Sequence, residues 1–598
     1  MFGRVRDFLL ARYPESTVNL QLLHGHASLS AEFAVMRLAA DRLLAPTAVE
    51  GESGYDGARP GVVAAEWFTH RKRGLLAPFG VGTVDQALLA ALQTRHVFVR
   101  LFGLAGKTVI FDEAHAYDSY MTQLLDRLLE WLAALGSSVV LLSATLPEAR
   151  RRQLAEAYLR GLGQPPYEPR GEARYPRLSW VGASGAGACP LETSPRATKE
   201  VDIRWVDGSL PAESLSFDLG VRLRDALADG GCTAVICNTV DRAQQVYLAL
   251  KPFFPGLADD GEPELDLLHA RYPFEDRQRR EKRSLLRFGR EGARVSMGEG
   301  DVREVLRPRR AVLVSTQIVE QSLDLDFDLM VTDPAPVDLV LQRLGRLHRH
   351  PRPRPRGVER PALWICAPQV DGEGVPAFGR GTEHVYDRHV LLRSWLALKD
   401  VPLLRVPGQV EELVEAVYGD RACPPELSGS LCRLWEETLA EQRLSLESET
   451  REAEERWLKP PTYGGALWRL ISDPREEDAP EFHKAHQALT RLTDPSVAVV
   501  CLYGRGGGVS LDREGSHLVD LRVTPAGELL RQLLRKSVTV SDRRVVWSLM
   551  AEAVPASWKR TPLLRHHRPL VLDANDAAVI GGLSLHLDRD IGLSVANA

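Results

Sequence analysis

The sequence has few cysteines, and they form no pattern typical of a disulfide framework or a zinc site. Its seven cysteines are scattered over 598 residues, and no two stand as a Cys-x-x-Cys pair. Long apolar runs are lacking as well: no stretch reaches the length of about 18 residues that a membrane span needs. The opening residues, MFGRVRDFLLARYP, lack the apolar segment of a secretory signal. These absences predict a protein of the reducing cytoplasm with no membrane partner.

An excess of basic charge is also lacking. The net charge is −5 at pH 7, whereas a generic nucleic-acid coat protein would be basic. A protein that holds a single strand in a local basic channel remains compatible with this balance. The chain is 44% hydrophobic and 26% charged, which is ordinary for a globular protein. Its length is sufficient for about three or four domains.

Two carboxylates stand where a predicted strand ends. Val109, Ile110 and Phe111 are apolar, which favours the end of a buried strand, and Asp112 and Glu113 follow directly. Ligands of open α/β sheets bind at the carboxyl ends of the strands. One carboxylate is therefore suited to hold Mg²⁺ on a nucleoside triphosphate, and its neighbour to orient or deprotonate the attacking water. The alternative is a strand followed by a charged turn.

A second set of polar groups is predicted on one face of a helix, in the segment QRLGRLHR at residues 342–349. Gln342, Arg346 and Arg349 recur at steps of four and three residues, so they share a face. Facing a cleft, they suit a triphosphate, and Arg346 and Arg349 are candidates to stabilise charge on the transferred phosphoryl group. A solvated helix face is the alternative.

A phosphate contact is one interpretation of Gly82 and Thr83, which precede a helix predicted over residues 86–93. Backbone N–H groups and a hydroxyl at a helix N-terminus suit a phosphate. Ordinary capping of the helix by Thr83 is an equally good interpretation.

The segment Gly106-Lys107-Thr108 contains the end of the phosphate-loop pattern but lacks its context. The pattern requires another glycine at position 101, which is Leu101. It also requires a following helix, and here the strand at 109–111 follows. We therefore do not interpret this segment as a phosphate loop, and no other stretch of the sequence supplies one.

These motifs resemble those of a known family. The segments VIFDEAH (109–115), LLSATLP (141–147), STQIVEQSLD (315–324) and QRLGRLHR resemble motifs II, III, V and VI of superfamily 2 helicases of the DEAH type. The stretch from Arg73 to Tyr120 and the two late motifs resemble the CRISPR-associated helicase-nuclease of type I interference systems. The resemblance covers nearly the whole chain.

The resemblance implies an α/β fold with two RecA-like parallel-sheet helicase lobes, the first truncated, a helical linker and a C-terminal accessory domain. The expected domains are residues 1–165 for the truncated first lobe, 166–200 for the interdomain linker, 201–368 for the second lobe, 369–480 for the helical linker region and 481–598 for the C-terminal accessory domain.

The resemblance also implies ATP and Mg²⁺ as cofactors and assigns roles to named residues. The catalytic group is Asp112, which holds Mg²⁺ through the nucleotide, with Glu113, His115, Gln342, Arg346 and Arg349. The residues that couple DNA to ATP are Ser143, Thr145, Asp324 and Arg343. The nucleic-acid-binding residues are Gly82, Thr83, Asn238, Thr239, Thr316 and Gln317.

The chain departs from the family in two respects. Complete members begin with a metal-dependent HD nuclease domain followed by a phosphate loop, motif I, whereas this sequence contains no His-Asp dipeptide and no such loop. Absence of the motif I strand near the middle of the first sheet would leave an apolar edge with unpaired backbone groups.

The resemblance and the departure together define the expected function. The first expectation is an ATP-dependent DNA helicase or translocase of CRISPR antiviral interference, present without its nuclease domain. The alternative is a non-catalytic DNA-binding remnant, or one half of a split helicase. The implied partners are single-stranded DNA, the RNA-guided CRISPR surveillance complex and a separate polypeptide that carries the HD nuclease and motif I.

Two basic segments have open interpretations. Residues 531–568 combine basic side chains with Trp547 and Trp558, which suits either a grip on single-stranded DNA or core tryptophans beside surface arginines. The run HPRPRPR at residues 350–356 is extended and basic, and it is either a solvated loop or a contact to nucleic acid.

Overall fold

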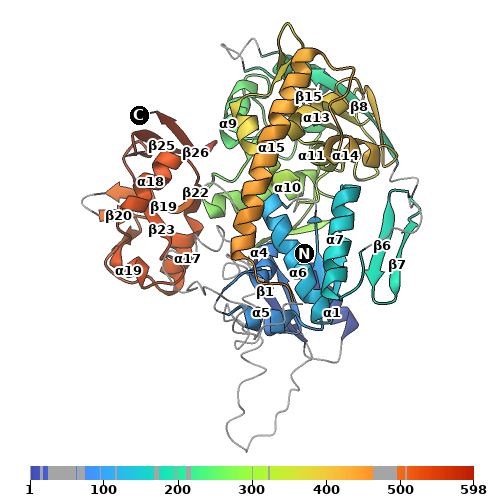
Figure 1. Cartoon of the computed structure of the whole chain (residues 1–598). Helices are drawn as coiled ribbons and strands as arrows, with labels where there is room; N and C mark the ends of the chain where they lie inside the picture. The colour runs from blue at the N-terminus through green and yellow to red at the C-terminus, as the bar shows by residue number, and fades with distance from the viewer. Residues whose placement is uncertain are drawn as a thin grey trace, which may run out of the picture. The chain divides into compact units, whose positions relative to one another are not determined.

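The structure is a computed structural model (Figure 1). Its chain divides into two compact units. The first unit comprises residues 1–172, 179–188 and 446–493, and the second comprises 173–178, 189–445 and 494–598. No helix in the part that the structure describes is both long and apolar enough to cross a bilayer. The described residues are 2–13, 18–23, 62–63, 74–94, 96–114, 117–166, 174–194, 198–210, 217–298, 301–320, 323–461, 495–505 and 508–597.

The first unit carries two separate pieces of parallel sheet, in the order β2-β1-β3 and β4-β5. The predicted strand before Asp112 is confirmed as β4, but it is buried on one face only. Its elements are α1 (Phe2–Arg12), β1 (Val18–Leu23), β2 (Val62–Val63), η2 (Gly74–Leu76), β3 (Phe79–Gly82), α4 (Val84–Leu88), η3 (Leu89–Ala91), α5 (Val97–Leu104), β4 (Thr108–Phe111), α6 (Ser119–Ala134), β5 (Ser138–Leu141) and α7 (Glu148–Gly161).

Helix α6 organises the core of the first unit. Asp118 caps its N-terminus by accepting a hydrogen bond from the Met121 N–H at 2.7 Å. Leucines spaced along one side of α6, including Leu124 and Leu128, are fully buried beside residues of α5, α7 and β4. Because the side chains of a strand alternate, this core covers only one face of the β4-β5 pair.

The other face of the β4-β5 pair is apolar and exposed. Ile110 and Val140 lie opposite each other in the register, and their exposed fractions are 63% and 39%. Leu142, just beyond β5, is also exposed. Parallel sheets are normally buried on both faces, so this surface is unusual for a strand pair of this kind.

The second unit contains a seven-stranded sheet in the order β10-β13-β9-β14-β15-β8-β18. All its pairings are parallel except that of β18 with β8. The elements as far as β15 are β8 (Lys199–Val206), α8 (Asp218–Ala226), β9 (Gly231–Ile236), α9 (Val240–Leu250), β10 (Leu265–Leu268), α10 (Phe274–Phe288), β11 (Arg294–Gly298), β12 (Asp301–Glu304), β13 (Arg310–Ser315), η7 (Gln317–Val319), β14 (Leu329–Thr332), α11 (Val337–Leu344) and β15 (Ala362–Cys366).

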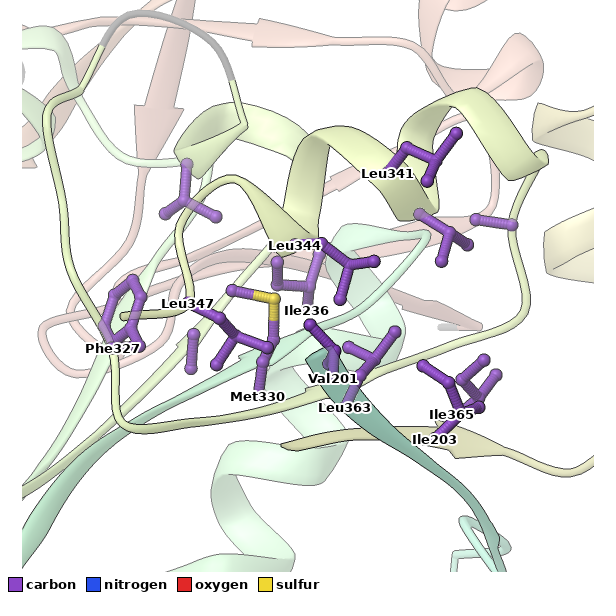
Figure 2. Packing of buried hydrophobic residues seen from close by; sticks show 14 of the residues in the cluster. Val201, Ile203, Ile236, Phe327, Met330, Leu341, Leu344, Leu347, Leu363 and Ile365 are labelled. Carbon is purple, nitrogen blue, oxygen red and sulfur yellow. The ribbon is translucent and has the colours of Figure 1, made fainter. Parts of the chain in front are cut away.

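Both faces of this sheet are covered. The sequence of β9, GCTAVI, is apolar almost throughout, as expected for a strand buried on both sides. Ala234 and Ile236 join one apolar cluster, whereas Val235 joins another on the opposite face. Figure 2 shows the first cluster, in which side chains of β8, β14 and β15 pack beneath Leu341 and Leu344 of α11.

Two features of the structure differ from the expected segments. The sheet continues beyond residue 368, because β18 pairs with β8. The segment expected as an interdomain linker contains the β6-β7 hairpin. The elements concerned are β6 (Arg177–Gly182), β7 (Gly185–Pro190), β16 (Gln369–Val370), β17 (Pro376–Ala377), α12 (Arg380–Val385), α13 (Arg388–Leu398), β18 (Leu403–Val406), α14 (Val410–Tyr418) and the long helix α15 (Gly429–Arg456; Figure 1).

The C-terminal region is built on two antiparallel-rich sheets, and its two tryptophans differ. Trp558 is buried, as the core interpretation predicts, but Trp547 on α18 is 69% exposed. The elements are β19 (Val497–Arg505), β20 (Gly508–Ser510), β21 (Leu518–Val519), α17 (Gly527–Arg535), β22 (Ser537–Val540), α18 (Arg543–Ala551), α19 (Ala556–Lys559), β23 (His567–Leu572), β24 (Ala577–Ile580), β25 (Leu583–Asp588) and β26 (Gly592–Asn597).

Candidate helicase site

Asp112 and Glu113 lie at the carboxyl end of β4. Asp112 is exposed, and its carboxylate accepts a hydrogen bond from the Glu113 N–H at 3.1 Å. Glu113 adopts a φ of 55°, a left-handed conformation that is uncommon for a residue with a side chain. Such conformations cluster at functional sites, which agrees with the predicted role of this pair. His115 lies outside the described residues.

The motif III residues follow the neighbouring strand. Phe111 of β4 pairs with Leu141 of β5, and the Leu142 N–H donates to the Phe111 carbonyl at 2.9 Å. Ser143 and Thr145 therefore emerge at the same edge of the sheet as Asp112. Thr145 is buried, and its hydroxyl has no hydrogen-bond partner among the described residues.

Lys107 has a structural role, in agreement with the rejection of a phosphate loop. Its ammonium donates hydrogen bonds to the carbonyls of Leu75 and Ala77, at 2.7 and 2.6 Å. Gly106 adopts a φ of 66° in the turn before β4, and a strand follows instead of a helix. Half-burial lowers the pKa of the Lys107 ammonium.

Gly82 and Thr83 lie at the junction of β3 and α4. A Cβ on Gly82 would approach Leu23 of the paired strand β1 to 2.9 Å, so close strand packing explains the glycine. The Thr83 side chain makes no capping hydrogen bond, so the capping interpretation is wrong for its hydroxyl. The predicted contact of both residues with DNA stays a prediction.

Asn238 and Thr239, which the resemblance assigns to motif IV of the family, lie beside motif V residues at the carboxyl edge of the second sheet. The Gln317 side-chain amide donates to the Asn238 carbonyl at 2.9 Å and to the Tyr386 hydroxyl at 3.0 Å. Thr239 caps α9 by accepting from the Arg242 N–H at 3.2 Å. Thr316, next to Gln317, is buried.

Arg343 extends this network into motif VI. It is completely buried, and its guanidinium forms an ion pair with Glu320 at 2.6 Å. It also donates to Thr332 and, at 3.3 Å, to the Tyr386 hydroxyl. Burial raises the pKa of the Glu320 carboxyl, and Arg343 opposes that rise. Arg343 thus positions neighbouring motif residues from inside the lobe.

The other motif VI residues lie nearer the surface. Arg349 forms an ion pair with Asp324 at 2.6 Å, and both side chains are about a third exposed, at 38% and 35%. Arg346 donates to the Glu320 carbonyl at 2.6 Å. Gln342 is half-buried on α11, which ends at Leu344, so the predicted common helical face is wrong for Arg346 and Arg349. The structure therefore brings Arg349 together with Asp324, and Arg346 together with the loop after motif V.

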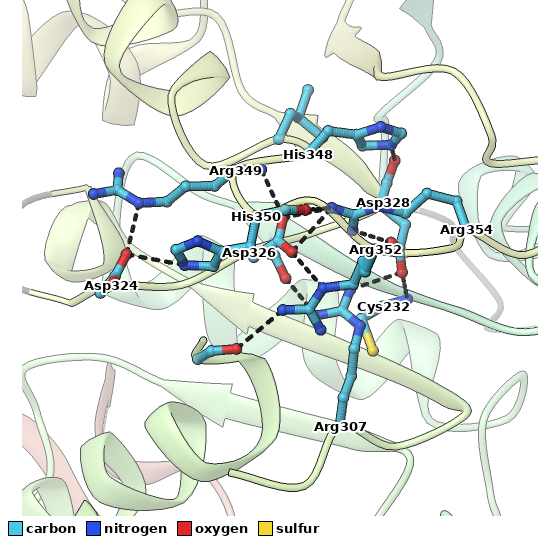
Figure 3. A network of polar contacts seen from close by, with 12 residues as sticks. Cys232, Arg307, Asp324, Asp326, Asp328, His348, Arg349, His350, Arg352 and Arg354 are labelled. Carbon is cyan, nitrogen blue, oxygen red and sulfur yellow. Dashed lines mark hydrogen bonds and ion pairs between the residues drawn. The ribbon is translucent and has the colours of Figure 1, made fainter. Parts of the chain in front are cut away.

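The two central arginines of the basic run at 350–356 are paired inside the protein. They are therefore neither solvated nor free to bind nucleic acid. Arg352 and Arg354 are buried and form ion pairs with Asp326 at 2.9 and 3.0 Å (Figure 3). Asp328 joins the same network through Arg354 and Arg307. Burial opposes the charged form of Asp328, but these arginines hold its pKa below the ordinary value. Both sequence interpretations are wrong for Arg352 and Arg354.

Sequence reasoning missed two residues of the site. Tyr386 links Gln317 with Arg343, and Glu320 neutralises Arg343. Tyr386 lies outside every motif and gives no signal in the sequence. Glu320 lies within the segment 315–324, directly after the apolar Ile318 and Val319, and an acidic residue beside apolar ones is a weak signal for a buried partner of opposite charge.

Comparisons with known proteins agree over the whole chain. The CRISPR-associated endonuclease/helicase Cas3 of Thermus thermophilus is 37% identical over 636 residues, covering 99% of this chain and 64% of the relative. A crystal structure of a CRISPR-associated protein is 45% identical with a TM-score of 0.82, covering 100% of this chain and 66% of that one. T. fusca Cas3 with AMPPNP is 32% identical with a TM-score of 0.80, covering 99% and 63%.

A chain in the structure of a CRISPR RNA-guided surveillance complex in a pre-nicking state is 29% identical with a TM-score of 0.71, covering 99% of this chain and 66% of that one. This chain therefore spans about two thirds of the length of the proteins that it matches.

The parallel sheet, with motif residues at the carboxyl ends of its strands, fits a helicase fold. A family model described as "CRISPR-associated nuclease/helicase Cas3, C-terminal" matches residues 229–352, and one described as "Cas3 C-terminal domain" matches residues 491–593. With the relatives above, these matches show that the chain belongs to the Cas3 family of CRISPR-associated helicases.

Proposed function

We propose that this chain is the motor part of a CRISPR-interference helicase, which translocates on single-stranded DNA by hydrolysing ATP. The hydrogen-bond network around Tyr386 carries the proposal. Through it, Gln317, assigned to the DNA strand, and Arg343, assigned to ATP coupling, share one partner. A shift of motif VI on ATP binding would therefore displace a group that faces the strand.

The first unit would supply the carboxylates of the reaction. Asp112 would hold Mg²⁺ on the triphosphate, and Glu113 would orient or deprotonate the attacking water. A single exposed carboxylate fits this task, because the phosphates and water provide the remaining ligands of a nucleotide-bound Mg²⁺. The similar T. fusca Cas3 bound to AMPPNP, a non-hydrolysable analogue of ATP, supports nucleotide binding.

Motif VI would supply the cationic groups of the reaction. Arg346, Arg349 and Gln342 would face the triphosphate and stabilise charge on the transferred phosphoryl group. Asp324 holds the Arg349 guanidinium in an ion pair, and this pair would open if Arg349 turned to the triphosphate. The chain in the RNA-guided surveillance complex supports that complex as the partner that delivers the DNA strand.

A second candidate is one half of a split helicase, and the exposed β4-β5 face favours it. Ile110, Val140 and Leu142 present apolar side chains to solvent next to Asp112. A polypeptide with a strand and a phosphate loop, as in motif I, would cover such a face. The non-catalytic remnant remains the alternative if no such polypeptide restores hydrolysis.

ATP hydrolysis stimulated by single-stranded DNA tests the proposal, with Glu113→Gln as the control. We expect the chain alone to show no hydrolysis above this control, because its sequence has no glycine-rich loop for the β- and γ-phosphates. Addition of a polypeptide with the HD nuclease and motif I should start hydrolysis in the wild type and not in Glu113→Gln.

Two outcomes would contradict this account. Hydrolysis by the chain alone that Glu113→Gln abolishes would show that a phosphate site exists among these 598 residues. No hydrolysis after the addition, with binding of single-stranded DNA retained, would leave only the non-catalytic DNA-binding alternative.

A further inference from the structure

The second unit contains an open pocket of about 340 Å³ at the carboxyl edge of its sheet. One wall is formed by Asn238 and Thr239 of motif IV, and the other by residues 377–382, which lie outside every helicase motif. Pockets that bind small molecules start at about 300 Å³, so this one has room for roughly one nucleotide.

The two walls are held together by direct contacts. The Asn238 side-chain amide donates to the Thr382 hydroxyl at 3.0 Å and to the Pro334 carbonyl at 2.7 Å. A Cβ on Gly381 would lie 3.3 Å from the Thr239 methyl group. Gly379, with a φ of 83°, turns the chain into α12. The segment 377–382 is therefore fixed against motif IV.

The charge of the pocket is positive. At its floor, Arg242 is neutralised by Asp333 at 2.9 Å and also donates to the Gly208 carbonyl. Arg380 at the rim is exposed, and no ion pair to it occurs among the described residues. One uncompensated guanidinium beside the Thr239 hydroxyl suits a phosphate.

The pocket also offers groups for a base. Phe378 lines it and is half-buried, so part of its ring remains accessible for stacking. Asn238 is 3% exposed, and its Oδ1 atom is buried with no hydrogen-bond partner among the described residues. Since a buried acceptor requires a donor, a ligand with N–H groups suits this wall better than a bare phosphate does.

We propose that this pocket holds one nucleotide of the translocated strand, with its phosphate on Arg380 and its base against Phe378. The proposal rests on the proposed function, because it places the single strand at motif IV. It deepens that function by assigning strand contacts to residues 378 and 380, which no helicase motif contains. Arg380 would act as the phosphate contact and Phe378 as the stacking platform.

Fluorescence anisotropy of a labelled oligothymidylate with the whole chain tests the phosphate contact. Arg380→Ala should weaken binding about tenfold and lower the slope of log K against log salt by about 0.7, the value for one phosphate of a single strand. Arg380→Lys should retain the slope. The matched control is Arg360→Ala: Arg360 is equally exposed but precedes β15, at the amino edge of the same sheet.

An abasic oligonucleotide of the same length tests the stacking contact. Phe378→Ala should weaken binding of the normal strand about tenfold and leave binding of the abasic strand unchanged. Phe378→Leu, which retains apolar packing, should likewise weaken binding of the normal strand and leave binding of the abasic strand unchanged. A merely structural role of Phe378 would weaken both strands equally.

The outcomes separate this inference from the proposed function. If Arg380→Ala and Arg360→Ala weaken DNA binding equally, or if neither variant weakens it, the proposal that the pocket holds a nucleotide is wrong. The helicase proposal would still stand. No detectable binding of single-stranded DNA by the wild type would overturn both.

Discussion

Arg343 shows how a motif residue can act without touching a ligand. Each of its guanidinium nitrogens has a partner inside the lobe, through Glu320, Thr332 and Tyr386. A charge buried this deeply is tolerated only because it is paired and fully hydrogen-bonded. Arg343 is therefore best described as a positioning residue that joins motif V to motif VI.

Loss of Arg343 should destabilise the second unit strongly. Arg343→Met leaves the Glu320 carboxylate buried without its counter-charge, which should lower the free energy of unfolding by about 3–5 kcal/mol. The double variant Arg343→Met with Glu320→Gln should recover part of this loss. Urea denaturation measures both.

Arg349→Met provides the comparison for this experiment. The Arg349–Asp324 ion pair is about a third exposed, so its loss should change stability by less than about 1 kcal/mol. Equal effects of Arg343→Met and Arg349→Met would show that the buried pair has no special importance.

At the residue scale, the sequence indicated which side chains lie at the ends of the strands. It did not indicate which residues from distant segments contact them. Periodicity predicted one helical face for Gln342, Arg346 and Arg349, but α11 ends at Leu344. It also could not show that Arg343 enters the core. The Pro-Arg alternation indicated an extended run, but the partners of Arg352 and Arg354 come from another segment. Asp326 is brought to them by the pairing of Phe327 with Leu347, a contact without a sequence signature.

The turn between β25 and β26 is the element that anchors the C-terminal region to the second lobe. Its Ile591 carbonyl accepts hydrogen bonds from Gln244 at 2.7 Å and from the His269 Nε2 at 3.0 Å. Gly592 adopts a φ of 73°, and a Cβ there would lie 2.7 Å from the Arg271 carbonyl. Only glycine satisfies both conditions at this position.

His269 should make this anchor sensitive to pH. Burial, with the nearby Arg271 and Arg280, lowers its pKa to about 3, although the hydrogen bond with the Ile591 carbonyl opposes the shift. Because the folded pKa lies below the unfolded value of 6.5, the stabilisation is complete above pH 6.5 and is lost as pH falls toward 3. Between pH 7.5 and pH 5 the loss should be about 2 kcal/mol.

Chemical denaturation at both pH values, with His269→Gln as the non-titrating control, measures this effect. The wild type should lose about 2 kcal/mol more stability than the variant between pH 7.5 and pH 5. Parallel losses would mean that other groups cause the acid sensitivity and that His269 titrates normally.

At the element scale, strong local patterns were predictive and distant pairings were not. Helix α6 follows from its amphipathic leucines and from Asp118, and β9 and β13 follow from their apolar runs. Strand β18 is short, and its partner β8 lies far away in the sequence, so nothing local distinguishes it from the helices around it. The β6-β7 hairpin was missed because its glycines and prolines resemble a linker.

On the scale of the whole molecule, the two units differ in how completely their sheets are covered. In the second unit, β9, β13 and β14 each pair with two strands and are buried on both faces. In the first unit, β4 and β5 pair only with each other among the described residues, and one face is exposed. The family assignment holds for both units. Because their sheets are covered to different extents, however, we do not expect the two units to be equally stable.

Amide hydrogen exchange read by mass spectrometry should reveal this difference. We expect β9, β13 and β14 to exchange at the slow limit set by global unfolding, and β4 and β5 to exchange faster, since opening a strand pair with one bare face exposes little new apolar surface. Protection could depend on how completely a strand is covered or on how many strands pair with it. Strand β10 separates these two causes, because among the described residues it also has a single partner, β13, but is buried along its whole length. If coverage decides protection, β10 will exchange slowly and β5 quickly. If the number of strand partners decides it, β10 and β5 will exchange alike, and the exposed side chains of Ile110 and Val140 will have no bearing on the stability of the first unit.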